Sequence, residues 1–283
     1  MDIVSNFKNG LYLASNSFNI LWRHKKLIIY LGIPIVIKSI LDLLIYNLYV
    51  DPSSIKAPLL QKEPILLLIK IAETYGWGRY IMVQLINFIF LLIFIFESMV
   101  LTIHVNDIYL GKPTGVRKSF VTCGHHISKA ITWTTIVFFP LLLQGYVKRP
   151  LPNLLALLFF LLWSLLTAFV IQAITIDKAN IISSIKKSII ALRLIFVEYI
   201  GTLFWIGLIA LLSATPFLLV DKFIYPMYPF QLITILSYTF ATILSCVIPT
   251  TYIISKTLLY QHYKEKKTRK NKEDEFIVPP TGL

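Results

Sequence analysis

The chain alternates long apolar runs with shorter polar segments that are rich in lysine and arginine. A helix rises about 1.5 Å per residue, so about twenty apolar residues cross the roughly 30 Å hydrocarbon core of a bilayer. Lipid offers the backbone no hydrogen-bond partners, so each run is expected to be a helix, and none shows the alternation of a barrel strand. The six predicted spans are Leu27–Tyr49, Ile81–Ile103, Ala130–Tyr146, Leu154–Ile176, Tyr199–Val220 and Leu232–Ile254.

Composition supports a membrane protein. Of the 283 residues, 57% are hydrophobic and 14% are charged, whereas about a quarter of a soluble domain is charged. The first run is expected to be retained as a span, because it is too long for a signal peptide and no small-residue cleavage site follows it. The predicted fold class is an all-α, polytopic membrane helix bundle over residues 1–262. Residues 263–283 are predicted to be a charged, disordered cytoplasmic tail.

The distribution of basic residues predicts the orientation. Residues 1–26, 104–129, 177–198 and 255–283 hold 19 of the 27 Lys and Arg, and the connections on the other side hold 7. The positive-inside rule therefore places both termini in the cytoplasm. The net charge of +13 is explained by this bias and by attraction to anionic headgroups. Nucleic-acid binding is excluded, since no recognition fold accompanies the charge.

One further apolar segment is too short to span. Pro64–Ala72 has about nine residues, is interrupted by Lys70 and lies near Trp77 and Tyr80. Such a segment fits a helix lying in the outer interface, and a re-entrant element is the alternative.

The cytoplasmic segments before spans one, three and five share a pattern of apolar stripes opposite basic residues. This spacing predicts three amphipathic helices that lie in the headgroup layer. The alternative is that they cap the end of the bundle. Arg117, Lys118, Lys186 and Lys187 are the predicted headgroup-facing residues. The apolar stripes comprise Phe7, Leu11, Phe18 and Leu21; Val116, Phe120, Cys123 and Ile127; and Ile182, Ile185, Ile189, Leu192 and Phe196.

Four stretches carry a family resemblance: "SFNILWRHKKLIIYLGIPIVI", "NFIFLLIFIFESMVLTIHVNDIYLGKPTGVRKSF", "LFFLLWSLLTAFVIQAITIDKANIISSIKKSIIAL" and "IPTTYIISKTLLYQHY". Together they resemble a family of uncharacterised prokaryotic multi-pass membrane proteins. In that family a Trp-containing entry to the first span is followed by paired basic amphipathic connectors. The resemblance implies the six-span layout and a prokaryotic plasma membrane, and it implies no activity. A proline expected near the end of the fourth span is absent here.

Polar residues at membrane depth form the candidate site. Glu97 lies inside the second span, and an isolated charge there costs at least about 2.5 kcal/mol. Its expected partner is Lys38, near the middle of the first span. These two residues, with Asp42 and Asn87, make a predicted polar seam between spans one and two. In one interpretation the seam fixes helix register. In the other it lines a solute or proton path, as transporters do.

The sequence contains almost no motif typical of metal binding or catalysis. The stretch "CGHH" offers Cys123, His125 and His126, but Cys123 falls on an apolar stripe while the histidines point elsewhere, so no metal site is predicted. The sequence contains no phosphate-binding glycine loop, nucleophile elbow or HExxH motif. We therefore expect no cofactor and no enzymatic activity.

The resulting expectation is a membrane-organising, assembly or scaffold component. Its expected partners are anionic lipids on the cytoplasmic side and a membrane protein or a second copy. The alternative is a small-solute or ion transporter that uses the polar seam.

Overall fold

The computed structural model describes residues 3–49, 77–112, 115–144, 158–159, 161–219 and 231–277, and every regular element in these ranges is helical. The all-α prediction is confirmed for this part of the chain. The helices are α1 (Ile3–Arg23), α2 (Lys26–Tyr49), α4 (Trp77–Tyr109), α5 (Val116–Gly124), α6 (Ile127–Gln144), α8 (Val170–Ile176), α9 (Ile181–Leu194), α10 (Phe196–Leu219) and α11 (Gln231–Ile277).

Helices α2, α4, α6, α10 and α11 each overlap one of the predicted apolar runs. In the described residues, three segments are long and apolar enough to cross a membrane: Ile81–Tyr109, Phe196–Ser213 and Thr242–Arg269. These helices indicate a membrane protein. The fourth predicted span differs from a simple helix, because residues 161–166 are helical, residues 167–169 form a turn and α8 follows.

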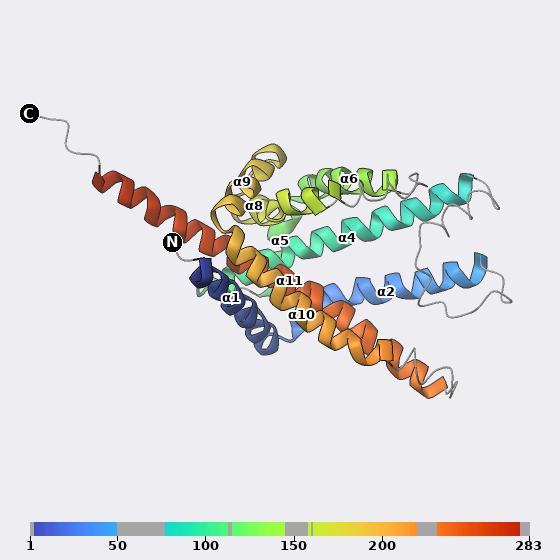
Figure 1. The fold of residues 1–283 in the computed structure, drawn as a ribbon. Helices are drawn as coiled ribbons and strands as arrows, with labels where there is room; N and C mark the ends of the chain where they lie inside the picture. The colour runs from blue at the N-terminus through green and yellow to red at the C-terminus, as the bar shows by residue number, and fades with distance from the viewer. Residues whose placement is uncertain are drawn as a thin grey trace, which may run out of the picture.

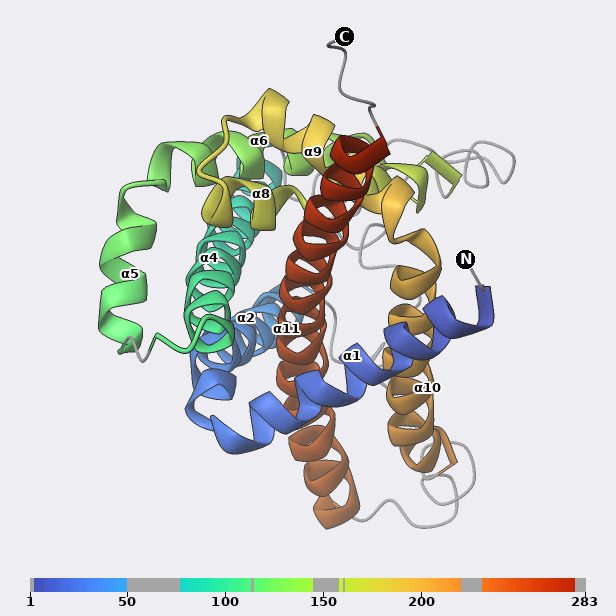
Figure 2. The ribbon, with the colours of Figure 1, turned by 90° about the vertical axis from the view of Figure 1, so that its left-hand side faces the viewer.

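The helices form a bundle with a polar end. α11 packs against α2, α4 and α10, and α4 packs against α2, α5, α6 and α8. Figure 1 shows both termini, α1 and α9 at the same end of this bundle. In Figure 2, which looks onto that end, α1 crosses in front of α10 and α11. The segments predicted to be cytoplasmic therefore gather on one side.

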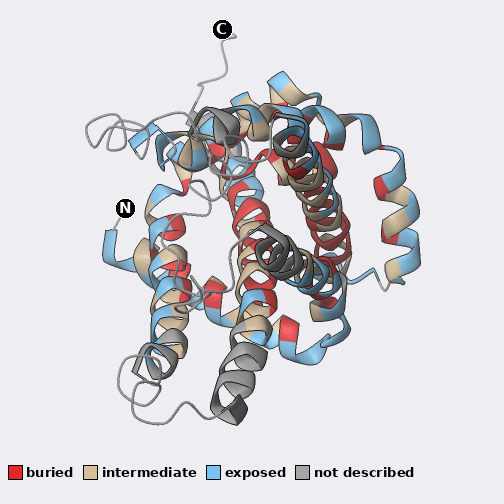
Figure 3. Cartoon of the chain, turned by 90° about the vertical axis from the view of Figure 1, so that its right-hand side faces the viewer, coloured by how far each residue is buried: buried red, intermediate tan, exposed pale blue. Residues whose placement is uncertain are grey.

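Three apolar clusters hold the helices together. The first joins α8, α9, α10 and α11 around Phe169, Tyr199 and Tyr260. The second joins α4, α5, α6 and α8 around Met99. The third joins α1, α2, α4 and α11 around Leu258. Figure 3 shows buried residues on the faces that helices turn towards their neighbours, with exposed residues on the outer faces. Exposed faces of α2, α4 and α10 carry isoleucine, leucine and phenylalanine, as expected where lipid surrounds the bundle.

Glycines bring α1 into backbone contact with α10. A Cβ added to Gly10 would lie 2.2 Å from the carbonyl oxygen of Glu198, and one added to Gly201 would lie 2.7 Å from that of Phe7. Thr202 Oγ1 donates a hydrogen bond of 3.0 Å to the Gly10 carbonyl. Small residues commonly permit such close crossings in membrane proteins. α1 is therefore fixed to the bundle by packing.

The predicted disorder of the tail is wrong for its first part, because α11 continues as a helix to Ile277. Two causes are visible. Lys, Glu and Arg are good helix formers and dominate "YKEKKTRKNKEDE". Lys264 and Lys266 also form ion pairs with the rest of the protein. Residues 278–283 and the segment Pro64–Ala72 lie outside the described residues.

Candidate functional site

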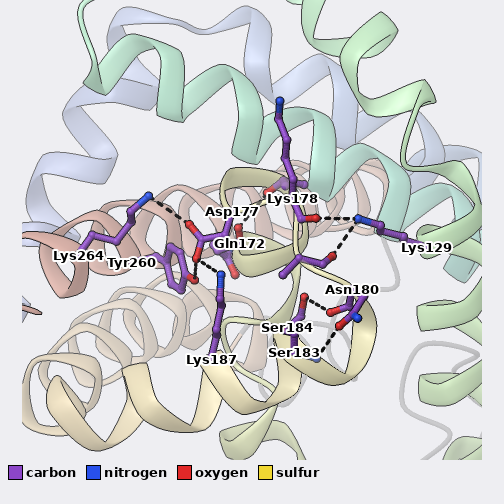
Figure 4. Close-up of polar contacts among 12 residues, drawn as sticks. Lys129, Gln172, Asp177, Lys178, Asn180, Ser183, Ser184, Lys187, Tyr260 and Lys264 are labelled. Carbon is purple, nitrogen blue, oxygen red and sulfur yellow. Dashed lines mark hydrogen bonds and ion pairs between the residues drawn. The ribbon is translucent and has the colours of Figure 1, made fainter.

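Two carboxylates at the polar end hold the charged part of α11. Asp177 follows the last residue of α8, and its Oδ2 accepts hydrogen bonds of 2.9 Å from Lys187 Nζ and from the Tyr260 hydroxyl. Lys264 Nζ donates to Asp177 Oδ1 at 3.1 Å. Figure 4 shows these side chains meeting from α9, α11 and the end of α8.

The second carboxylate is Glu198, in the first turn of α10. Its side chain is 1% exposed, and its Oε1 accepts a hydrogen bond of 2.8 Å from Lys266 Nζ. Lys266 also donates to the Leu194 carbonyl oxygen at 3.2 Å, and His262 Nε2 lies 3.8 Å from Glu198 Oε1. We name the two groups together the α11 clamp; it comprises Asp177, Lys187, Glu198, Tyr260, Lys264 and Lys266.

The local sequence explains where Asp177 lies. Lys178 has φ 54°, a left-handed conformation that ends α8 sharply. Asn180 then begins α9, because its side chain accepts a hydrogen bond of 2.9 Å from Ser183 N. Lys129 of α6 donates to the carbonyl oxygens of Lys178 and Ala179 at 3.0 and 2.9 Å (Figure 4). The turn that presents Asp177 is therefore fixed at both ends.

The electrostatics of Asp177 favour a structural role over acid–base chemistry. Burial and the negative end of the α8 dipole oppose its ionisation. Hydrogen bonds from Lys187, Lys264 and Tyr260 outweigh burial and hold the pKa of Asp177 below its ordinary 3.8. A group that stays ionised at neutral pH is poorly matched to proton transfer there. The clamp thus fits a fixed joint between helices.

The predicted polar seam is only partly described. Lys38, Asn87 and Glu97 are half-buried on α2 and α4, which pack against each other, and the side chain of Asp42 lies outside the described residues. Glu97 Oε2 is buried and has no hydrogen-bond partner among the described residues. The pairing of Lys38 with Glu97 stays a prediction.

The predicted headgroup-facing residues divide into two groups. Arg117, Lys118 and Lys186 are exposed on α5 and α9. Lys187 instead turns to Asp177 within the protein. Contact of the exposed three with lipid stays a prediction, whereas Lys187 has a role that the sequence did not reveal.

The "CGHH" stretch lies at the end of α5. Cys123 is buried with Sγ 3.6 Å from the Phe96 carbonyl oxygen, and burial raises the pKa of its thiol to about 12. Such a thiol is inert as a nucleophile at neutral pH. His126 is buried and His125 is exposed. Among the described residues, no three His, Cys, Asp or Glu side chains lie together in a way that could hold a metal ion.

The clamp itself was missed by sequence reasoning. The signal was present, because Asp177 and Glu198 are the acids at the two ends of a segment that is otherwise basic. The expectation of a disordered tail hid the partners Lys264 and Lys266. No family model, curated protein or solved structure matches this chain.

Proposed function

We propose that this chain is a six-span protein of the plasma membrane with both termini on the cytoplasmic side. The six apolar runs and the excess of Lys and Arg on one set of connections support this topology. The gathering of both termini, α1 and α9 at one end of the bundle agrees with it (Figure 1). The described helices α2, α4, α6, α10 and α11 correspond to five of the six runs.

We further propose a non-catalytic role as a scaffold that presents the charged end of α11 to another membrane component. The observation that carries this proposal is the α11 clamp. It joins α11 to the α8–α9 turn through Asp177 and to α10 through Glu198. Beyond Lys266, α11 continues away from the bundle (Figure 1), with Lys267 and Arg269 exposed. A solvent-facing helix that is anchored at its base in this way is suited to hold a partner at a fixed place and direction.

The test is site-specific photo-crosslinking in living cells. A photo-reactive amino acid at Arg269 should give a discrete crosslinked species, since a scaffold holds its partner in one position. Glu198→Gln should reduce or redistribute that species because it loosens α11. A matched control replaces exposed Arg117 with the same photo-reactive residue, which should be unaffected by Glu198→Gln. Absence of crosslinking at every exposed position from Lys267 to Asn271 would contradict the scaffold role.

A transporter is the second candidate, and two observations favour it. The chain breaks its helix at residues 167–169 within an apolar run, and broken helices form solute sites in many transporters. Glu97 Oε2 and Gln172 Oε1 are buried acceptors without hydrogen-bond partners in the part of the chain that the structure describes. Proton or solute flux into liposomes that is lost in Glu97→Gln, with the fold intact, would favour transport over the scaffold.

A further inference from the structure

α9 turns its small residues and Leu192 inward and three of its five isoleucines outward, while Ile181 and Ile185 are partly buried against the core. Ser184, Ser188 and Ala191 are fully buried, whereas Ile182 is 70% exposed, Ile189 41% and Ile190 52%. A helix that packs on a protein core in water shows the opposite arrangement, because burial of apolar surface drives its packing. The outward face therefore points to an apolar medium or partner beyond the described chain.

Hydrogen bonds fix this orientation. Ser188 Oγ donates to the Leu166 carbonyl oxygen at 2.8 Å and accepts from Phe169 N at 3.0 Å. Both backbone groups belong to the break before α8, where the regular helical bonding is interrupted. A rotation of α9 that buried Ile189 would remove these bonds from buried backbone, which is unfavourable. The exposure of the isoleucines is thus built into the fold.

Positive charge shares the outward face. Ile182, Lys186, Ile189 and Arg193 follow one another at intervals of four, three and four residues, which places them along one side of a helix. Lys186 and Arg193 are exposed, and α9 contains no acidic residue. Long basic side chains of this kind extend towards phosphate groups while neighbouring apolar residues insert below them.

The same surface continues into a helix that is able to cross the membrane. α9 ends at Leu194 and α10 begins at Phe196, the first residue of the candidate span Phe196–Ser213. Phe196 and Phe204 are exposed on α10. The end of α9 consequently lies where this span enters the bilayer, at headgroup depth.

We propose that the outward face of α9 lies in the cytoplasmic headgroup layer and binds anionic phospholipid. We name this face the α9 lipid face; it comprises Ile182, Lys186, Ile189, Ile190 and Arg193. The inference rests on the proposed membrane topology. It differs from the sequence-based expectation in that Lys187 is excluded, because its ammonium group forms an ion pair with Asp177 of the same chain.

Immersion of the face is tested by spin labelling. The single label Ile189→Cys, in a background with Cys123→Ala and Cys246→Ala, is placed in vesicles of phosphatidylcholine and phosphatidylglycerol. We expect collisions with oxygen to exceed collisions with a water-soluble nickel chelate, as for a label below the phosphates. Leu211→Cys, from the exposed side of α10, reports the span, and Lys267→Cys reports water.

The outcomes separate the two proposals. A water-exposed label at Leu211→Cys would overturn the membrane topology itself. A lipid-exposed Leu211→Cys with a water-exposed Ile189→Cys would overturn the α9 lipid face alone. A label at Ile189→Cys shielded from both reagents would also overturn it, in favour of contact with a second copy.

The charge requirement is tested by replacing Lys186 and Arg193 with glutamine. Mass spectrometry measures the phosphatidylglycerol that the purified protein retains. The affinity of the protein for this lipid should fall by roughly fivefold for each charge removed. The matched control removes Lys267 and Arg269, two exposed charges on α11, and should retain lipid as the wild type does. Equal retention in both double variants would contradict the proposal.

Discussion

Glu198→Gln tests the α11 clamp most sharply. The Glu198 side chain is 1% exposed and its partner Lys266 is 15% exposed, so the variant leaves a largely buried cation without its counter-charge. Removing one partner of a buried pair typically costs about 3–5 kcal/mol. Lys266 keeps the Leu194 carbonyl and slight solvent access. We therefore expect a loss of about 3 kcal/mol in the free energy of unfolding.

Lys187→Gln is the internal comparison. Lys187 is 37% exposed beside Asp177, so its loss should cost only about 1 kcal/mol.

The assay is reversible unfolding by sodium dodecyl sulfate in mixed micelles, followed by circular dichroism. Glu198→Gln, Lys266→Gln, the double variant and the wild type form a double-mutant cycle. Residues in direct contact should give a coupling energy of about 0.5–3 kcal/mol. Additivity of the two single effects would refute the ion pair as the joint between α10 and α11.

Three further predictions follow from single contacts. Gly10→Ala should destabilise the protein strongly and displace α1, since its Cβ would lie 2.2 Å from a carbonyl oxygen. Gly207→Ala should instead stabilise by up to about 1 kcal/mol in the same unfolding assay, because no other helix of the described chain comes within 4 Å of the added Cβ. Asp177 has a lowered pKa, so its contribution is fully present above pH 3.8 and is lost as pH falls below it; the stability difference between wild type and Asp177→Asn should stay constant from neutral pH down to that point. A difference that does not shrink as pH falls below 3.8 would show that the partners of Asp177 do not lower its pKa. Glu97→Gln should lower the melting temperature, and adding Lys38→Met to that variant should restore part of the loss. Strict additivity of the two single effects would refute the predicted pair.

The hydrophobic pattern predicted most of the described helices, because a segment that spans lipid must satisfy its own backbone hydrogen bonds and a helix does so. The run from Leu27 to Tyr49 became α2 with nearly the same bounds, and Tyr199–Val220 lies within three residues of α10 at either end. The break at residues 167–169 was not predicted. It depends on Ser188, nineteen residues away from Phe169, which supplies a hydrogen bond that no local pattern reveals.

Faces were harder to predict than helices. The apolar stripe of α9 was identified from periodicity, but periodicity does not say which side meets protein. In the structure Ser188 and Ala191 take the protein side, because small residues permit close approach in membrane proteins. The same rule applies to Gly10 and Ala14 of α1, which are buried where a soluble helix would place large apolar residues. The apolar face of an amphipathic helix beside a membrane can therefore contact either the protein or the lipid.

In the C-terminal tail, composition predicted disorder where the structure has a helix. High charge and the lack of an apolar period favour disorder on composition alone. Lys264 and Lys266 nevertheless find Asp177 and Glu198, and the helix persists to Ile277. Pairs between residues so distant in the sequence become visible only when the fold brings them together.

Impermeant thiol labelling in intact cells tests the central claim, a six-span protein whose clamp and both termini lie in the cytoplasm. Single cysteines are introduced at Ser54, at exposed Lys118 and at exposed Lys267, with Cys123 and Cys246 buried in the structure. The account predicts labelling of Ser54→Cys in intact cells and of Lys118→Cys and Lys267→Cys only after permeabilisation. Labelling of Lys118→Cys or Lys267→Cys in intact cells, with Ser54→Cys protected, would contradict it.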